Sequence, residues 1–487
     1  MNRADAILRQ PAAVLGTGAL LLVAVSTLHS KLAGVLWGLA FLSGGVLAWL
    51  RRPWPPPDEV DRAASVILLC VGYALVCWLA LALVWGELFP PLSAEPNAGL
   101  RLVIGALAAA WIVRVGFRGD GEPQLPGLAN APLLAPLPAP LPASPPAPPP
   151  ARPALVAKPE LGSHSPERIT HLIIAVLATA TLVAAAVALL TPRERLPSNA
   201  IAWASSVGFL ACLLIVFAVD RETAPWQRWL AGTGSCAGLI AIGASQVRGA
   251  YAVALWLLGV VLWGAYRRHA QPSRLLTLAC LGVGAFAACL AWSWWHPSDP
   301  LRMREISMGI ERMRTDRDFN SQTGSRIYLF ALGWQTFREA PLVGVGVQER
   351  LRRIHASGLD ETMEKEHNTA HVRELGHVHN AYLHHSMDGG LVGLSAFLAT
   401  LLALLWAAGI IRARSSVAAV QFYGLAWVHA VTNITNVNFA HNYYALMFSI
   451  SAGLILVNAR VAGRPGQGAA LFNRRKSDPH AADDRQL

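Results

Sequence analysis

Long apolar runs recur along most of the chain and are separated by short polar connections. Each run has about 17–25 residues, the length that an α-helix needs to cross the hydrocarbon core of a bilayer. The runs are continuous rather than alternating in polarity, which argues against a β-barrel. The pattern therefore predicts an all-α polytopic membrane protein with about twelve transmembrane helices. The expected spans are residues 12–28, 32–50, 63–86, 100–117, 169–190, 199–219, 230–246, 250–266, 275–295, 388–411, 417–435 and 440–457.

The composition supports this class of protein. Hydrophobic residues make up 54% of the chain and charged residues only 14%, whereas a soluble domain carries about a quarter charged residues. The net charge of +11 is spread over many connections instead of one soluble domain, so we expect no nucleic-acid partner. Most Lys and Arg residues of the short connections fall on one side of the bundle. The positive-inside rule then predicts that both termini are cytoplasmic and that the one long loop lies on the other side.

Two further segments interrupt the spans. A proline-rich stretch is expected to form an extended cytoplasmic linker, and the polar, basic C-terminal tail is expected to be disordered. The predicted organisation is residues 1–120 with the first four spans, 121–168 as the linker, 169–295 with five spans, 296–387 as the long loop, 388–457 with the last three spans, and 458–487 as the tail.

The long loop is neutral overall but densely charged. Apolar residues recur at helical spacing after Ser325, which predicts an amphipathic helix that ends near Pro341. These apolar positions are Ile327, Phe330, Ala331, Trp334 and Phe337. A second, highly charged helix is expected between Leu359 and Leu375. The loop is too short and too polar for an independent domain, so we expect it to cap a cavity between the spans.

Four histidines gather where the loop meets the next apolar run: His377, His379, His384 and His385. Histidine is the side chain that most readily takes up a proton near neutral pH. His379 lies just before the span, where it can face both a lipid-embedded donor and a water-soluble group. It is therefore the first candidate for a general base, although the pattern leaves its three neighbours open, as well as a surface histidine without a role.

Several arginines on the loop side are candidates for anion binding. Arg248 lies in a tight turn between two spans, on the side where short connections carry few cations. Its planar guanidinium suits phosphate oxygens, and an interfacial arginine that reaches lipid headgroups is the alternative. Arg326 opens the amphipathic helix and Arg338 lies near its end. Arg193 and Arg195 form a second pair in a short connection on the same side.

A metal site is the alternative use of the histidines. His367 and His371 are four residues apart, and His377 and His379 follow. This spacing could hold zinc, but no H-E-x-x-H motif occurs, no cysteine joins the loop, and its acidic residues are interleaved with basic ones. We therefore expect no metal and no cofactor. The absence of G-x-S-x-G also argues against a nucleophilic serine.

Three motifs give the chain a resemblance to the O-antigen ligases, within the superfamily that also includes O-antigen polymerases and bacterial protein O-oligosaccharyltransferases. The motifs follow one another in the order and at the spacing typical of that superfamily. They are S-x-x-R-G-A around Arg248, R…W…P-x-x-G-x-G from Arg326 to Gly346, and H-N-x9-G-x-x-G from His379 to Gly393.

The resemblance implies a GT-C-like glycosyltransferase in the bacterial inner membrane. Such an enzyme transfers O-antigen from undecaprenyl diphosphate to the lipid A-core oligosaccharide at the periplasmic face, with inversion and without a metal. By position, His379 would be the general base, while Arg248 and Arg326 would bind the diphosphate and stabilise its departing charge. The expected substrate-binding residues are Asn380, Arg338, Arg193, Arg195, His377 and Tyr382.

Three alternatives are open at this point. An O-antigen polymerase often carries R-x10-G patterns in its loops, and the long loop has none. A protein O-oligosaccharyltransferase usually has a substantial soluble C-terminal region, whereas the tail here is short. A secondary transporter would place ionisable groups and broken helices near mid-membrane, whereas these spans are almost free of charge. The pattern therefore favours an enzyme that works at the membrane face.

Overall fold

The computed structural model describes residues 57–86, 94–111, 166–268, 271–357 and 369–462, together with residues 18, 22 and 35. Apart from residues 18, 22 and 35, the expected spans 12–28 and 32–50 lie outside the described residues, as do nearly all of the proline-rich linker and the tail beyond residue 462. Within the described ranges the regular structure is helical and contains no strand.

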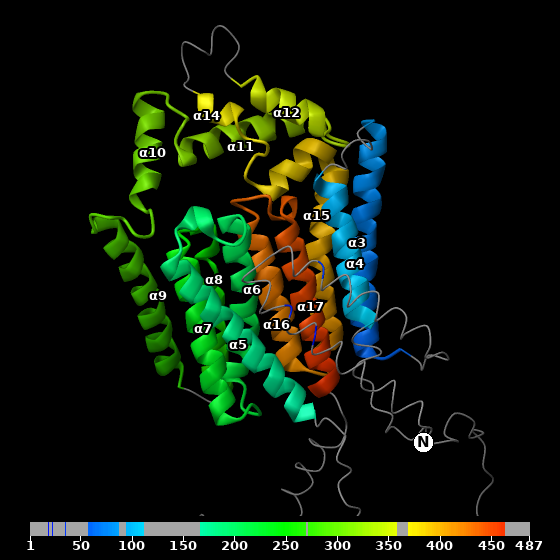
Figure 1. The fold of residues 1–487 in the computed structure, drawn as a ribbon, viewed down its shortest axis with the longest axis vertical. Coiled ribbons are helices and arrows are strands. Elements are labelled where there is room, and N and C mark those ends of the chain that lie inside the picture. Colours follow the sequence, from blue (N-terminus) through cyan, green and yellow to red (C-terminus); the bar gives the residue numbers. More distant parts are fainter. Residues whose placement is uncertain are drawn as a thin grey trace, which may run out of the picture.

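Ten of the described helices stand side by side in a bundle (Figure 1). Their bounds lie within six residues of the expected apolar runs, except that α15 begins seven residues earlier. They are α3 (Glu59–Val84), α4 (Ala94–Trp111), α5 (Pro166–Leu190), α6 (Ala200–Val219), α7 (Pro225–Ala244), α8 (Val253–Arg267), α9 (Pro272–Trp295), α15 (Ala381–Ile411), α16 (Ser416–Thr432) and α17 (Asn442–Ala462).

In the described part of the chain, seven helices are long and apolar enough to cross a membrane. These are α3, α5, α6, α8, α9, α15 and α17, while α4, α7 and α16 pack among them. The prediction of an all-α membrane protein is thus confirmed, and the total of about twelve spans stays a prediction.

The centre of the bundle is formed by α6 and α17. In the most apolar 18-residue stretch of each helix, 89% and 94% of the residues are buried, whereas none is buried in the corresponding stretch of α9. Small residues bring neighbouring helices close together. A Cβ atom added at Gly234 of α7 would lie 2.9 Å from the Cα atom of Ala178 in α5. Such close backbone approach replaces the hydrophobic effect as the source of packing energy between helices in lipid.

The long loop folds over one end of the bundle (Figure 1). Its helices are α10 (Arg304–Thr315), α11 (Gln322–Glu339), α12 (Val347–His355) and α14 (Ala370–Arg373). They enclose a small apolar core of their own, made of Leu329, Ile354, Val372, Val378 and Met387. The helix expected after Ser325 is confirmed as α11. The sequence did not predict α10 or α12, and only α14 is described from the second expected helix.

The apolar stripe of α11 faces outward, contrary to what its spacing suggests. Ile327 and Trp334 are 38% and 55% exposed, while Leu329, Gly333 and Thr336 are buried. The buried face packs on the start of α15: a Cβ atom added at Gly333 would lie 3.5 Å from Leu383, an ordinary contact distance. Contacts with α15 and with the apolar core around Leu329 therefore decide which face of this helix is covered.

The span expected to begin at residue 388 is part of a longer helix, α15, which begins at Ala381. The side chain of Asn380 caps it by accepting a hydrogen bond from the backbone N–H of Leu383, at 3.0 Å. His384 and His385 fell within the expected loop, but both are buried inside the structure. The helix begins seven residues before the expected span because tertiary contacts accommodate polar groups within it.

Gly390 interrupts α15 with a φ of 58°. At this break α15 is hydrogen-bonded to the turn that follows α11. Leu391 N–H donates to the carbonyl of Pro341 at 2.8 Å, and Gly346 N–H donates to the carbonyl of Asp388 at 3.0 Å. The glycines of the two motifs noted in the sequence are thus where the loop and the last spans are joined backbone to backbone.

Candidate active site

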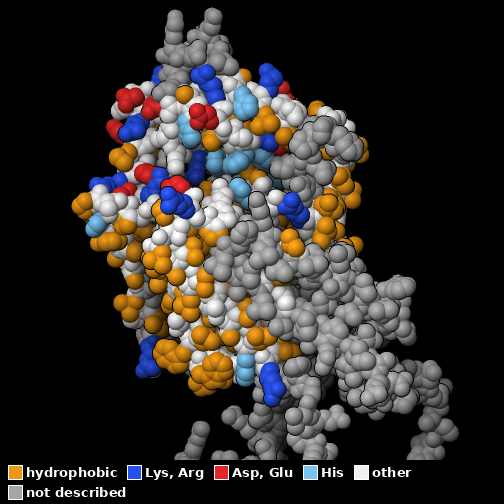
Figure 2. Space-filling model, viewed as in Figure 1, with side chains coloured by type: hydrophobic (Ala, Val, Ile, Leu, Met, Phe, Trp, Pro, Cys, Tyr) orange, Lys and Arg blue, Asp and Glu red, His pale blue; other side chains and the backbone are white. Residues whose placement is uncertain are grey.

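Four connections that are far apart in the sequence meet at the loop end of the bundle. Arg248 Nη1 donates to the carbonyl of Arg302 at 3.1 Å, which joins the turn after α7 to the segment after α9. The backbone N–H of Ala381 donates to the carbonyl of Asn433 at 2.8 Å, which joins the start of α15 to the connection between α16 and α17. Figure 2 shows histidine side chains gathered where the polar upper part of the molecule meets the apolar bundle.

His379 ends the segment that leads into α15. Its φ of 52° is unusual for a residue other than glycine, and such strained backbone tends to occur at functional sites. Its ring lies 4.2 Å from the ring of His377, measured between centroids. Its Nδ1 atom is buried and has no hydrogen-bond partner in the described structure.

The environment of His379 favours the neutral imidazole. Burial lowers its pKa to about 4, the positive charge of Arg326 acts in the same direction, and a hydrogen bond with Asn436 opposes them. The ring is therefore unprotonated at neutral pH. A neutral ring with an unpartnered nitrogen can accept a proton, which is what a general base requires.

Three arginines lie close together beside this histidine. Burial and the neighbouring charges of Arg248 and Arg302 lower the pKa of Arg326 to about 10, so it stays positively charged at neutral pH. Glu305 is the one carboxylate within ion-pair distance of the cluster among the described residues. It lies 2.5 Å from Arg302 and 4.0 Å from Arg248. The excess positive charge suits an anion with more than one negative charge.

A buried ion pair fixes the histidine segment, which runs from Gly376 to Asp388 and carries His377 and His379. Arg350 of α12 contacts Asp388 of α15 at 2.6 Å and also donates to the carbonyl of Gly376. His384 lies 3.5 Å from the same carboxylate. The ring of His377 lies 6.5 Å from that of His384, measured between centroids. Burial together with the charges of His379 and His384 lowers the pKa of His377 to about 2. The segment that carries His379 is thus tied to two helices.

The remaining candidates lie apart from this centre or are engaged elsewhere. Asn380 caps α15, and the hydroxyl of Tyr382 donates to the carbonyl of Ala430 at 3.0 Å, so both hold the start of α15 in place. Arg338 is exposed and lies about 18 Å along α11 from Arg326.

Arg193 and Arg195 form a short 3-10 helix, η2 (Arg193–Arg195), between α5 and α6 at the loop end of the bundle (Figure 1). In the described structure no hydrogen bond or ion pair joins either residue to Arg248, Arg326 or His379. His367, which belongs to the alternative metal site, lies outside the described residues.

Several residues of this centre were not predicted from the sequence. Arg302 and Arg350 are two among many loop arginines, and nothing in their spacing marks them. The connection between α16 and α17 does carry a sequence pattern that indicates a polar site, since N-I-T-N-V-N places three amides between two apolar runs. Asn436 donates to Asn438 at 2.8 Å, and the backbone N–H of Asn438 donates to Asn433 at 3.1 Å. These amides shape the wall beside His379.

The fold and the site define a polytopic membrane protein with a cluster of histidine and arginine side chains at one face of its helical bundle. Residues 233–398, from α7 into α15, match the family model described as O-antigen ligase. The match includes Arg248, Arg302, Arg326 and His379. It confirms the resemblance found in the sequence and supports the O-antigen ligase/polymerase superfamily. It also supports a glycosyltransferase-type enzyme rather than a transporter. A search of curated proteins gives no match.

Proposed function

We propose that this protein is an O-antigen ligase, which transfers a glycan from undecaprenyl diphosphate to the lipid A-core oligosaccharide. The observation that carries the proposal is the convergence of His379, Arg326 and Arg248 from three separate segments of the family match. A base beside a cluster of guanidinium groups is the combination that glycosyl transfer from a lipid diphosphate requires.

The proposed reaction is a single displacement at the anomeric carbon of the donor sugar. The acceptor hydroxyl oxygen attacks from the face opposite the diphosphate, and its proton passes to Nδ1 of His379. The new carbon–oxygen bond forms as the bond to the diphosphate oxygen breaks, so the configuration is inverted. The bonding electron pair leaves with the diphosphate. General-base assistance of this kind is worth about 10²–10⁴-fold in rate.

The leaving group would be held by the arginine cluster. Arg248, Arg302 and Arg326 approach one another from the turn after α7, the segment after α9 and α11, and the pKa of Arg326 is lowered by burial. In such a partly desolvated site, fixed positive charges stabilise the developing charge more strongly than they would in water. The diphosphate needs no proton to depart, so the residues present supply the base and the electrophilic assistance without a metal or cofactor.

The other candidate residues have supporting roles in this proposal. Asn436 orients the ring of His379, and His377 lines the approach of the acceptor. Asn380 and Tyr382 fix the start of α15. Arg338, Arg193 and Arg195 stay candidates for substrate contacts at the edge of the site. In the cell, the site would face the periplasm from the inner membrane, with both termini cytoplasmic and about twelve spans in a GT-C-like arrangement.

A transfer assay tests the proposal. The full-length protein is purified and given undecaprenyl-diphosphate-linked glycan together with lipid A-core, for the wild type, His379→Ala and His355→Ala. His355 is an exposed histidine of the same loop and serves as the matched control. We expect transfer by the wild type and the control and none by His379→Ala. Glycan joined only to glycan would instead identify an O-antigen polymerase, transfer only to protein would identify an O-oligosaccharyltransferase, and no transfer would refute all three.

A further inference from the structure

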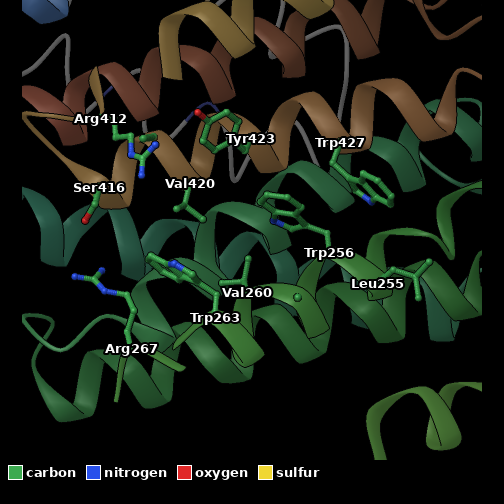
Figure 3. Close-up of a pocket in the computed structure, with 12 residues that line it drawn as sticks. Leu255, Trp256, Val260, Trp263, Arg267, Arg412, Ser416, Val420, Tyr423 and Trp427 are labelled. Carbon is green, nitrogen blue, oxygen red and sulfur yellow. The ribbon is translucent and has the colours of Figure 1, made fainter. Parts of the chain in front are cut away.

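A cavity lies at the side of the bundle, away from the candidate active site. It has a volume of about 870 Å³ and runs between α8 and α16. Figure 3 shows its wall of large side chains, with Trp256, Val260 and Trp263 from α8 facing Tyr423 and Trp427 from α16. Leu255 at its edge is 45% exposed, so the cavity is an open groove on the side of the bundle. An apolar groove of this kind suits a hydrocarbon chain.

One end of the groove is positively charged. Arg267, Arg412 and Ser416 lie together at this end, while Leu255 and Trp427 lie at the other (Figure 3). Arg267 ends α8 and Arg412 follows α15, and both helices begin at the active-site end of the bundle. The two guanidinium groups therefore lie at the opposite membrane face from His379.

Neither of these two arginines has a carboxylate partner among the described residues. Arg414, only two residues after Arg412, lies 3.3 Å from Asp58 and 3.6 Å from Glu59. Arg267 instead lies over the ring of Trp263, 4.9 Å from its centroid. This leaves two positive charges beside an apolar groove, and no acidic side chain in the described part of the chain balances them.

The dimensions of the groove match one leaflet of a bilayer. From Leu255 to Arg267 the α8 axis rises about 18 Å, and half of a hydrocarbon core is about 15 Å thick. A lipid whose phosphate lies between the arginines would therefore extend its acyl chain along the aromatic wall to the bilayer midplane. Guanidinium groups bind phosphate oxygens in a bidentate manner.

We propose that this groove binds an anionic phospholipid of the leaflet opposite the active site, with its phosphate held by Arg267 and Arg412. The charged end excludes the polyprenyl donor as the primary occupant, because the donor diphosphate must lie at the other membrane face, beside His379. A polyprenyl chain carries no anion at its far end and would leave the two arginines unbalanced. The distinction from the donor site rests on the proposed function, whereas the binding of a phospholipid by the two arginines does not.

Lipid binding to the purified full-length protein tests the headgroup. Phosphatidylglycerol and phosphatidylethanolamine with identical acyl chains are titrated and quantified by native mass spectrometry. We expect phosphatidylglycerol to bind at least about tenfold more tightly, and the double variant Arg267→Gln/Arg412→Gln to weaken it by about thirtyfold. Arg268→Gln is the matched control, because Arg268 carries the same charge at the same end but does not line the groove. Equal affinity for both lipids, or an equal loss with Arg268→Gln, would overturn the proposal.

A groove-filling variant tests the chain. Gly259 lines the groove, and a Cβ atom added there would meet nothing within 4 Å. Gly259→Leu is therefore expected to keep the thermal stability of the protein while weakening the binding of phosphatidylglycerol at least about tenfold. Unchanged binding would show that the groove is not the site. The proposal would be refuted if undecaprenyl phosphate bound more tightly than phosphatidylglycerol and if Gly259→Leu, but not the double arginine variant, weakened that binding. The occupant would then be a polyprenyl chain.

Discussion

Arg350 and Asp388 form a buried ion pair between α12 and α15, with Nε of the arginine 2.6 Å from Oδ1 of the aspartate. The same arginine donates to the carbonyl of Gly376, three residues before His379. His384 approaches the other oxygen of the carboxylate at 3.5 Å. The pair therefore fixes the position of the histidine segment relative to the helix that follows it.

Removing one member of this pair is expected to destabilise the protein strongly. Arg350→Met leaves a buried carboxylate without its main counter-charge, which typically costs about 3–5 kcal/mol. Thermal unfolding in detergent, followed by tryptophan fluorescence, measures the loss. The double variant Arg350→Met/Asp388→Asn should lose less than the sum of the two single variants, because the second change removes the unpaired charge. Additive losses would contradict a direct pairing.

Gly390 is expected to tolerate no side chain. Its φ is +58°, and a Cβ atom there would lie 2.4 Å from the carbonyl carbon of Leu342. Gly390→Ala should therefore separate α15 from the turn after α11, with an unfolding temperature lower by several degrees and a loss of transfer activity. Gly409, in the same helix, has nothing within 4 Å of its added Cβ. Gly409→Ala should be neutral or stabilising by up to about 1 kcal/mol, and equal effects at both positions would contradict this explanation.

The pH dependence of transfer should reflect the lowered pKa of His379. Because the neutral ring is the active form and its pKa is about 4, kcat/KM should stay level as the pH falls from 7 to about 5 and then decline through about 4. Arg326→Gln removes a positive neighbour, so the midpoint should move to higher pH in the activity that remains. Intrinsic fluorescence over the same range reports whether the fold is intact. A midpoint at or above 6.5 would show that His379 is not buried in solution.

The arginine cluster should contribute mainly to the rate. Arg326→Gln and Arg248→Gln are each expected to lower kcat by about 10²–10³-fold, the cost of losing one preorganised donor at the departing charge. Lysine should restore only part of the loss, since it lacks the planar fork. Arg314, an exposed arginine of α10, provides the control Arg314→Ala, which should retain normal kcat. Equal losses at Arg314 would indicate a general effect of loop charge.

Asn436 is expected to act through His379 rather than on the substrate. Its hydrogen bond raises the pKa of His379, so Asn436→Ala should lower the midpoint of the pH profile further. We expect kcat to fall about tenfold while KM changes little, since the ring would lose its orientation but the binding arginines would remain. Asn436→Asp should move the midpoint in the opposite direction, because a nearby negative charge favours the protonated ring. A fall in kcat without any change of midpoint would contradict this role.

The positions of the spans could be predicted from the sequence because the bilayer imposes a length on every apolar helix. The expected runs at 199–219 and 275–295 correspond to α6 and α9 within three residues. The helix after Ser325 and its end before Pro341 also followed from local rules of periodicity and turn chemistry. In contrast, the outward face of α11 and the start of α15 at Ala381 could not be predicted from the neighbouring residues in the sequence. Both depend on contacts with segments dozens of residues away.

The sequence by itself determined the helical membrane class, the polar loop, and the three motifs that supplied His379, Arg248 and Arg326. Only the tertiary structure decided that these side chains meet, that Arg302 and Asn436 join them, and that Arg350 holds the segment behind them. The physical reason is that apolar periodicity and glycine or proline signals act over a few residues. The meeting of charged groups depends on how whole helices pack, and on which buried polar atoms can be paired at the end of the bundle.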